Sequence, residues 1–422
     1  MEIKEIVQKK VNGVVSIPGS KSYANRALIV AALANGKTKL TNLPTCDDVK
    51  LMCDALKLIG VKINEISKTE IEIIPPTELK YDGEIYVGAA GTTMRFLMSL
   101  CSTGIGDVVL NGNERMCQRP VEDLIAALET NVDGTITAKN KTVDGERCPP
   151  IEIHSKGLLG GKIKLAGNTS SQYLTSILLS SPKAKDVIEI EITGDLTSKS
   201  YADMTIDVMK QFGVDVINND YKTFKVPAAK YFARDYMVES DASGLSYFLA
   251  AAAITGGKIR INNVNPNSVQ GDIKFIDLLE RMGCTIEKGA DYFVLEGPSE
   301  LNAIEVNMNS MPDTAQTLAM LAAVAKGTTK ISGISNLRVK ETDRIFALKT
   351  ELAKCGIKST ADDDSITIVG GTPNGAQIKT YDDHRMAMSF AILGLATCGL
   401  TVEDPKCVSK SFPEFWELLE AI

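Results

Sequence analysis

The sequence predicts a two-domain α/β protein in which each domain contains three β-α-β-α-β-β units. One observation is a pattern of about 70 residues that recurs along the chain: an Ala- and Leu-rich helix, a Gly, a strand, an Asp-led helix and two more strands. The other is size, because 422 residues, 44% of them hydrophobic and 23% charged, suit two globular domains with buried cores.

A recurring Asp marks the period. We expect it to open the second helix of each unit, and it stands at Asp48, Asp123, Asp203, Asp272 and Asp343, at intervals between 69 and 80 residues. A sixth, degenerate unit ends the chain, where SFPEFWELLEAI takes the place of this helix. Six units of this size account for the whole length, with no long linker between them.

The elements of one unit follow from its residues. Positions 49–59 contain apolar residues at helical spacing, with Asp48 before them and Gly60 after them. The stretches GVKINEI and TEIEIIP then alternate as two strands. The first helix of a unit is apolar all round (AAAAI, LAAVA), so we expect it to be covered on every side.

Composition excludes several classes of protein. The net charge of −7 argues against binding to nucleic acid or to an anionic membrane. Two histidines cannot build a His-rich metal site, and the nine cysteines form no C-x-x-C pair, so free thiols in a reducing compartment are expected. The N-terminus has no signal-peptide core, and the longest apolar run, 247–255, is too short to span a bilayer. We therefore expect a cytoplasmic protein.

Four expected helix starts carry small polar residues, and three of them also carry cations. Free N–H groups at a helix N-terminus suit anions, although each opening alone also fits an ordinary capped helix. In the first opening Ser20 separates Gly from Lys, which breaks the pattern of a nucleotide-binding P-loop. The four openings are PGSKSYANRA, VGAAGTTMRFL, GNTSSQYLTSILLSS and TYDDHRMAMSFAILGLA.

Further charged residues lie in loops. Lys340 and Arg344 form a like-charge i, i+4 pair if helical, which is unfavourable unless an anion lies between them. Arg119 precedes a Pro, and Lys410 lies between two serines. Asp313 follows Met-Pro before an Ala-rich helix; by itself it is best interpreted as a helix cap, and among cations it is also a candidate general base.

Taken together, these motifs resemble the enolpyruvyl transferase family, and within it the branch that acts on shikimate 3-phosphate. The resemblance covers the whole chain, in family order and spacing. It rests on PGSKSYANRALIVAALANG, AGTTMR, QRP, SSQYLTS, VKETDR, DDHRMAM and KSFP.

The resemblance implies a two-domain inside-out α/β barrel whose chain crosses between domains twice. The expected pieces are 20–238, which would bind shikimate 3-phosphate, and 1–19 plus 239–422, which would carry Asp313 and part of the phosphoenolpyruvate site. The implied reaction transfers the enolpyruvyl group of phosphoenolpyruvate to the 5-hydroxyl of shikimate 3-phosphate and releases phosphate. No metal or cofactor is implied, and a monomer is expected.

The resemblance also assigns residue roles. Asp313 would be the base, and either Lys21 or Glu341 the acid. The residues implied for shikimate 3-phosphate are Lys21, Ser22, Arg26, Ser170, Ser171, Gln172, Ser198, Tyr201, Asp313, Asn336 and Lys340. Those implied for phosphoenolpyruvate are Lys21, Gly91, Arg119, Gln172, Arg344, Arg385 and Lys410. Both ligands are anions, which arginine recognises well.

The chain departs from the family pattern at Ala89, Phe96, Cys117 and Leu337, which leaves sensitivity to the inhibitor glyphosate open. One alternative is the sister enzyme that acts on UDP-N-acetylglucosamine. It usually carries Lys-Asn where this chain has Lys21-Ser22, and its loop cysteine stands five residues before the Arg-Pro pair, where this chain has Glu114. A non-enzymatic repeat scaffold is the other alternative, and it would scatter cations over exposed helices.

Overall fold

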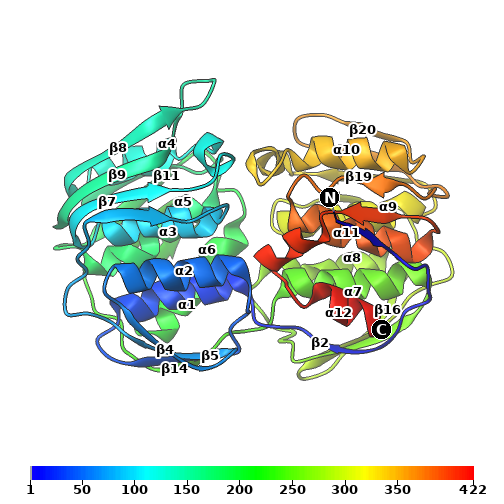
Figure 1. Ribbon diagram of the computed structural model, residues 1–422, viewed down its shortest axis with the longest axis horizontal. Coiled ribbons are helices and arrows are strands. Elements are labelled where there is room, and N and C mark those ends of the chain that lie inside the picture. Colours follow the sequence, from blue (N-terminus) through cyan, green and yellow to red (C-terminus); the bar gives the residue numbers. More distant parts are fainter. Residues whose placement is uncertain (1) are drawn as a thin grey trace. The chain divides into compact units, whose positions relative to one another are not determined.

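The structure, a computed structural model, describes residues 2–422. The chain crosses twice between two separately packed units (Figure 1). We call Lys21–Val238 the continuous unit, and Met1–Ser20 together with Glu239–Ile422 the split unit. Each unit has its own hydrophobic core.

The continuous unit consists of three four-stranded sheets, three inner helices and three outer helices. In each sheet the first two strands in spatial order are parallel and the other pairs are antiparallel. The sheets, in spatial order, are β14(Asp235–Met237)-β3(Thr38–Thr41)-β5(Glu70–Ile74)-β4(Lys62–Ser67), β6(Gly83–Tyr86)-β7(Ile105–Asn111)-β9(Arg147–Leu158)-β8(Val132–Lys141) and β10(Gly161–Ala166)-β11(Ile188–Thr193)-β13(Thr223–Val226)-β12(Ile217–Asn219). The inner helices are α1(Lys21–Leu33), α3(Gly91–Cys101) and α5(Ser171–Ser180), and the outer ones are α2(Asp47–Leu58), α4(Glu122–Glu129) and α6(Lys199–Gln211).

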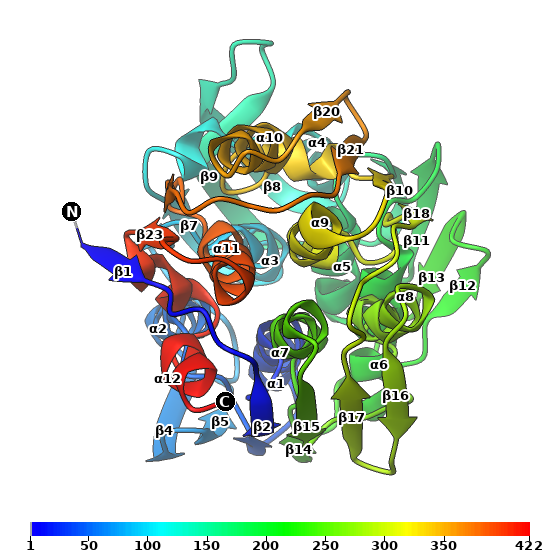
Figure 2. The same cartoon turned by 90° about the vertical axis from the view of Figure 1, so that its right-hand side faces the viewer.

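The split unit repeats this plan with two four-stranded sheets and a smaller third one. Figure 2 shows its inner helices end-on, with the strands arranged around them. The sheets are β16(Thr285–Lys288)-β17(Tyr292–Glu296)-β15(Lys258–Asn262)-β2(Asn12–Ser16), β18(Glu305–Asn307)-β19(Thr328–Ser332)-β21(Ile366–Val369)-β20(Ser359–Ala361) and β1(Ile3–Glu5)-β23(Thr401–Glu403)-β22(Gln377–Ile378). The inner helices are α7(Ala242–Thr255), α9(Ala315–Val324) and α11(His384–Ala396), and the outer ones are α8(Phe275–Arg281), α10(Arg344–Lys354) and α12(Phe415–Glu420).

The inner helices α7 and α9 are buried because they are apolar on nearly every face, as the sequence predicts. Every residue of α7 from Ala242 to Ala253 is buried, and α9 is buried from Ala315 to Ala323. Inner helices of one unit pack against one another, and the sheets lie outside them. Among residues 2–422 the sheets remain separate and none closes into a barrel.

Three of the six β-α-β-α-β-β repeats are completed by a strand from a distant part of the chain. The strand β2 pairs in parallel with β15, and β14 pairs in parallel with β3. The degenerate sixth unit is completed by β1, which pairs antiparallel with β23. Where the chain crosses, the Ser20 N–H donates to the Glu239 carbonyl at 2.7 Å, and Gly19 and Ser240 form an antiparallel bridge.

The prediction that the recurring Asp opens its helix holds only for Asp343, which caps α10 by accepting from the Phe346 N–H at 3.0 Å. The expectation is wrong for the others. Asp48 and Asp123 are second residues of their helices, Asp203 lies one turn into α6, and Asp272 lies in the 3₁₀ helix η3(Gly271–Lys274). For Asp48, Asp123 and Asp272 the physical reason is that other side chains bind these carboxylates, as described below.

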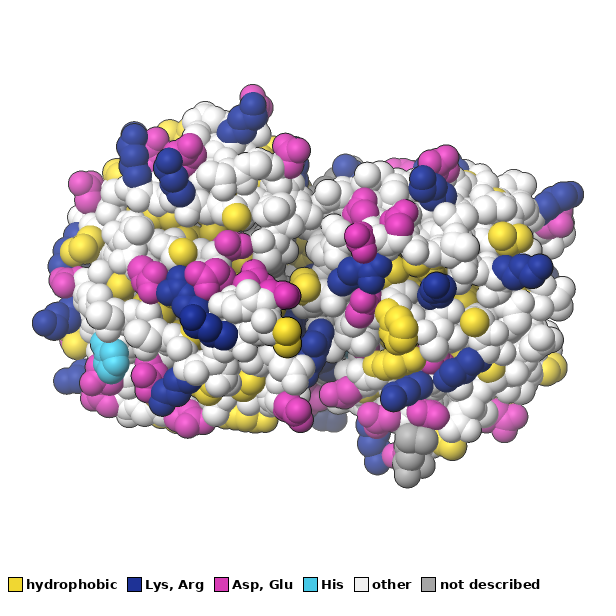
Figure 3. Space-filling view, turned by 90° about the horizontal axis from the view of Figure 1, so that it is seen from above, with side chains coloured by type: hydrophobic (Ala, Val, Ile, Leu, Met, Phe, Trp, Pro, Cys, Tyr) yellow, Lys and Arg dark blue, Asp and Glu magenta, His cyan; other side chains and the backbone are white. Residues whose placement is uncertain are grey.

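In the stretch 2–422, no helix is both long enough and apolar enough to cross a bilayer. Figure 3 shows one face of the surface, on which basic and acidic side chains are interspersed.

Candidate active site

In the continuous unit, the predicted site residues gather at the starts of the inner helices. Lys21 is the first residue of α1, Gly91 of α3 and Ser171 of α5. Hydrogen bonds link these starts: the Gln172 amide nitrogen lies 3.4 Å from the Thr92 hydroxyl, so α5 is tied to α3. We call this group the continuous-unit cluster. Its members are Lys21, Ser22, Arg26, Gly91, Arg119, Ser170, Ser171, Gln172, Ser198 and Tyr201.

Lys21 is held by a carboxylate from an outer helix. Its Nζ lies 3.0 Å from Asp48 Oδ2, and both side chains are largely buried. The Thr93 hydroxyl donates to the Asp48 carbonyl at 3.4 Å, so this end of α2 is also tied to α3. A buried ion pair of this kind fixes the position of the ammonium group.

Arg26 is a buried cation without a carboxylate at ion-pair distance in the described chain. It donates from Nε to Thr205 Oγ1 at 2.9 Å and from NH2 to the Tyr201 carbonyl at 3.1 Å. It also donates to the Ser22 carbonyl at 2.8 Å. Burial lowers the pKa of Arg26 to about 10. Its guanidinium therefore ties α1 to α6 and brings a positive charge beneath Ser22 and Tyr201.

Gly91 stands where two guanidinium groups approach the backbone. A Cβ at this position would lie 2.5 Å from Arg95 NH1 and 2.7 Å from Arg119 NH1. Arg95 NH1 donates to the Gly91 carbonyl at 3.0 Å, and Arg95 lies over the ring of Tyr173. Only glycine leaves room for both cations at this helix start.

Most of the remaining residues of this cluster carry hydroxyl groups, and Gln172 carries an amide. Ser170 caps α5 and accepts from the Gln172 N–H at 3.3 Å, which confirms the capping role that the sequence allows. Ser198 precedes α6 with φ 54°, a left-handed conformation that non-glycine residues seldom adopt. Such strain is typical of functional positions. The Gln172 Oε1 is buried without a hydrogen-bond partner in the described chain.

In the split unit, Asp313 is clamped by two arginines. Arg385 NH2 lies 2.7 Å from Asp313 Oδ2, and Arg385 NH1 donates to the Asp313 carbonyl at 3.0 Å. Arg344 NH1 lies 3.5 Å from Asp313 Oδ1. Asp313 belongs to the 3₁₀ helix η4(Pro312–Thr314), and Thr314 is the N-cap of α9. The interpretation of Asp313 as a helix cap is therefore wrong.

Arg344 is the centre of this group. Its side chain is 2% exposed and meets Asp383, which is 0% exposed, from Nε at 2.7 Å and from NH2 at 3.2 Å. Its NH2 also lies 2.9 Å from Glu341 Oε2. Burial alone would lower the pKa of Arg344, but Asp383, Glu341 and Asp313 together raise it above the usual value. Arg344 is thus a permanent cation.

The other predicted residues of the split unit adjoin this arginine. Lys410 Nζ lies 3.1 Å from Glu341 Oε1, so Glu341 faces two cations. Asn336 lies in the 3₁₀ helix η5(Ser335–Val339), and Lys340 directly follows it. We call this group the split-unit cluster. Its members are Asp313, Asn336, Lys340, Glu341, Arg344, Arg385 and Lys410.

Sequence reasoning missed the carboxylates that hold these cations. Asp383 has no assigned role in the sequence motifs, yet it binds Arg344 and caps α11 by accepting from the Arg385 N–H at 2.9 Å. Asp48 and Asp272 entered only as markers of the repeat. The recurrence of these aspartates was the signal that could have revealed their role. Three of the five bind a side chain at or just before the start of an inner helix: Asp48 binds Lys21, Asp123 binds Thr169 and Asp272 binds Ser243.

Among residues 2–422, no group of three or more His, Cys, Asp or Glu side chains is arranged to hold a metal ion. The side chains of the two clusters are cations, hydroxyls, amides and carboxylates, which can bind anions, orient them and move protons.

Comparison with known proteins identifies the family. The profile of EPSP synthase (3-phosphoshikimate 1-carboxyvinyltransferase) matches residues 7–419. The chain belongs to this family. It is 44% identical to the 3-phosphoshikimate 1-carboxyvinyltransferase of Vibrio campbellii, over 98% of this chain and 97% of the relative. It is 43% identical to that of Sulfurovum sp., with the same coverage.

The fold agrees with this assignment. The structure of EPSP synthase from Acinetobacter baumannii superimposes with a TM-score of 0.80 at 27% identity, covering 99% of this chain and 97% of that one. The family and the α/β fold expected from the motifs are thereby confirmed.

Proposed function

We propose that this enzyme transfers the enolpyruvyl group of phosphoenolpyruvate to the 5-hydroxyl of shikimate 3-phosphate, with the continuous-unit cluster holding the acceptor. Family membership supports the reaction. The two clusters support the residue roles, because Lys21, Arg344 and Arg385 each lie in the first turn of a helix, where phosphate groups bind.

The reaction needs a base for the hydroxyl and an acid for the methylene carbon. The 5-hydroxyl attacks C2 of phosphoenolpyruvate while C3 takes a proton. The resulting tetrahedral intermediate then loses phosphate as C3 returns that proton. Proton transfer by positioned side chains is worth about 10²- to 10⁴-fold in rate, so both groups should be visible in kinetics.

We assign Asp313 as the base. Its Oδ2 is bound closely by Arg385 at 2.7 Å, whereas its Oδ1 makes the longer contact of 3.5 Å with Arg344. A carboxylate in this position can accept the proton of the hydroxyl group. The two arginines would hold the carboxylate in place during the transfer.

We assign Lys21 as the acid in preference to Glu341. Glu341 faces Arg344 at 2.9 Å and Lys410 at 3.1 Å, so both of its carboxylate oxygens already take part in ion pairs with cations. Lys21 Nζ is held in place by Asp48 Oδ2 at 3.0 Å, and a lysine ammonium group has protons to donate. The assignment requires residues of both units to act on one pair of substrates, and substrate-induced compaction in small-angle scattering tests that requirement.

The decisive experiment measures phosphate release from phosphoenolpyruvate with shikimate 3-phosphate, with no metal added. Turnover with UDP-N-acetylglucosamine in its place would overturn the proposal. Asp313→Asn should lower kcat by about 10²-fold or more while shikimate 3-phosphate still binds. Asp277→Asn, an exposed carboxylate on α8, is the matched control and should keep full activity. Equal turnover of the two variants would refute the base assignment.

We further propose that the enzyme works as a monomer in the cytoplasm. The cysteines are free thiols throughout residues 2–422, which fits a reducing compartment. Mixed charge on the face in Figure 3 gives no support to a nucleic-acid or membrane partner. Light scattering on the purified protein tests the monomer, and a dimer mass would contradict it.

A further inference from the structure

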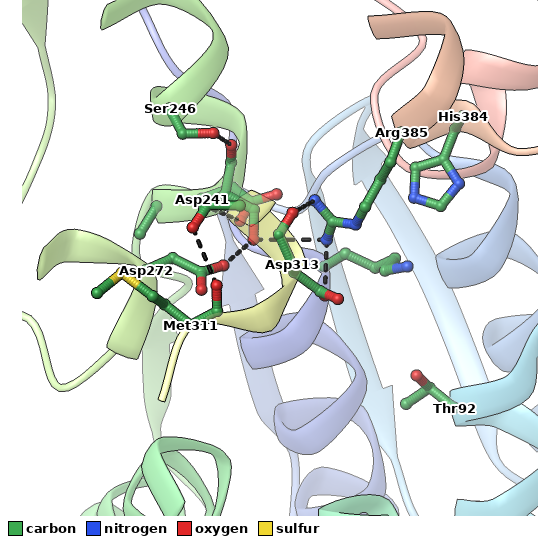
Figure 4. Close-up of polar contacts among 12 residues, drawn as sticks. Thr92, Asp241, Ser246, Asp272, Met311, Asp313, His384 and Arg385 are labelled. Carbon is green, nitrogen blue, oxygen red and sulfur yellow. Dashed lines mark hydrogen bonds and ion pairs between the residues drawn. The ribbon is translucent and has the colours of Figure 1, made fainter. Parts of the chain in front are cut away.

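A chain of contacts links the proposed base to a buried carboxylate that the mechanism does not use. Figure 4 shows Asp272, Asp313 and Arg385 in this group. The Ser243 hydroxyl donates to Asp272 Oδ2 and lies 3.5 Å from Arg385 NH2. Arg385 NH2 in turn lies 2.7 Å from Asp313 Oδ2. The chain therefore runs from Asp272 through Ser243 and Arg385 to Asp313, within the split unit.

Asp272 has features that a structural role leaves unexplained. It is 6% exposed, and its Oδ1 has no hydrogen-bond partner in the part of the chain described here. It does not cap η3, whose N-cap is Gln270. A buried carboxylate with one bare oxygen is costly as an anion, so a neutral side chain would be more stable at this position.

Several charged groups face Asp272. They are Asp241, which caps α7; Asp313 in η4; and Arg385 at the start of α11. Burial raises the pKa of Asp272 to about 7, the charge of Asp313 adds to the increase, and Ser243 and Arg385 oppose it. Asp272 thus changes charge near neutral pH, beside the arginine that clamps the base.

We propose that Asp272 is a positioning residue for the reaction: through Ser243 it holds the Arg385 guanidinium, and with it the Asp313 carboxylate, in one orientation. This inference rests on the proposed function, in which Asp313 is the base. When Asp272 is ionised, it accepts from the Ser243 hydroxyl, whose lone pair then faces Arg385. When Asp272 is protonated, the hydroxyl is free to rotate and Arg385 loses this fixed acceptor.

The test is the ratio of kcat for the native enzyme to kcat for Asp272→Asn as a function of pH. Ionisations of the substrates are common to both proteins and cancel in the ratio. The ratio should rise about tenfold between about pH 6 and about pH 8, because only the native enzyme gains the ionised carboxylate. Ser243→Ala should give the same rise, and Ser243→Thr, which keeps the hydroxyl, should restore most of the native rate.

The matched control is Glu351→Gln. Glu351 is a fully buried carboxylate of the same unit that binds Lys354 at 2.7 Å and the Tyr381 hydroxyl at 2.7 Å, outside the site. Its loss should lower stability and leave the kcat ratio independent of pH. A pH-independent ratio for both Asp272→Asn and Ser243→Ala, with an active native enzyme, would overturn the inference alone. A native enzyme that releases no phosphate would overturn the proposed function, and this inference with it.

Discussion

Replacing Arg344 by methionine should destabilise the split unit strongly. The side chain is 2% exposed, and Asp383, its closest partner, is 0% exposed. Removing one partner of a buried ion pair leaves the other charge uncompensated and costs about 3–5 kcal/mol. For a unit of about 200 residues, each kcal/mol shifts Tm by about 2–4 °C, so a loss of about 6–20 °C is expected.

Two further variants separate charge burial from simple loss of the side chain. Arg338→Met removes an arginine that also pairs with a carboxylate, Asp343, but at 31% exposure, so the ion pair itself should contribute at most about 1 kcal/mol. Asp383→Asn added to Arg344→Met removes the stranded charge and keeps an oxygen to cap α11. This double variant should recover about half of the lost stability.

The fluorescence of a single residue allows unfolding of the split unit to be followed. Trp416 is the one tryptophan of the chain, and it lies on α12 in the split unit. Urea unfolding followed by its fluorescence therefore measures the unit that contains Arg344. If Arg344→Met lost less than about 1 kcal/mol, or no more than Arg338→Met, the argument from buried charge would be wrong.

Three other changes test the site. Gly91→Ala places a Cβ 2.5 Å from Arg95 NH1 and 2.7 Å from Arg119 NH1. The substitution should therefore raise KM for phosphoenolpyruvate about tenfold in steady-state kinetics. Binding of shikimate 3-phosphate, measured by calorimetry, should be unchanged. Lys21→Arg keeps the charge but not the proton donor, so kcat should fall by about 10²-fold; an unchanged kcat would remove Lys21 as the acid. Because the pKa of Asp272 is raised to about 7, its proton-linked stabilisation is full below about pH 4 and lost as pH rises through about 7. Asp272→Asn should therefore be more stable than the native protein at about pH 8 and not at about pH 4, as urea unfolding would show.

The repeat and its buried helices could be predicted because both leave local signals. An apolar helix such as α7 is covered on every side wherever the rest of the chain lies. The pairing of β2 with β15 could not be predicted from the sequence. Neither short strand contains a local pattern that identifies a partner more than two hundred residues away. Parallel strands need a crossover, and its route is set by packing of the whole unit.

The cations of the site could be predicted from the sequence, but the carboxylates that bind them could not. Arg344 and Arg385 lie in motifs that stand out by charge and spacing. Asp48 and Asp272 resemble helix caps in the sequence, because Asp before an apolar run is the usual sign of a helix start. Only the packed structure shows that side chains from inner helices bind these carboxylates instead.

The two clusters differ in how far their cations are paired with carboxylates. In the split unit, the cations Arg344, Arg385 and Lys410 meet the carboxylates of Asp313, Glu341 and Asp383, so charge is balanced before a ligand arrives. In the continuous unit, Arg26 and Arg95 are buried with no carboxylate at ion-pair distance in the described chain. An anion that binds near these two arginines meets no competing carboxylate, and Asp48, which pairs with Lys21 at 3.0 Å, is the one carboxylate described in that cluster. An anion that binds the split-unit cluster must compete with three carboxylates. This difference supports the proposed role of the continuous unit as the holder of the acceptor.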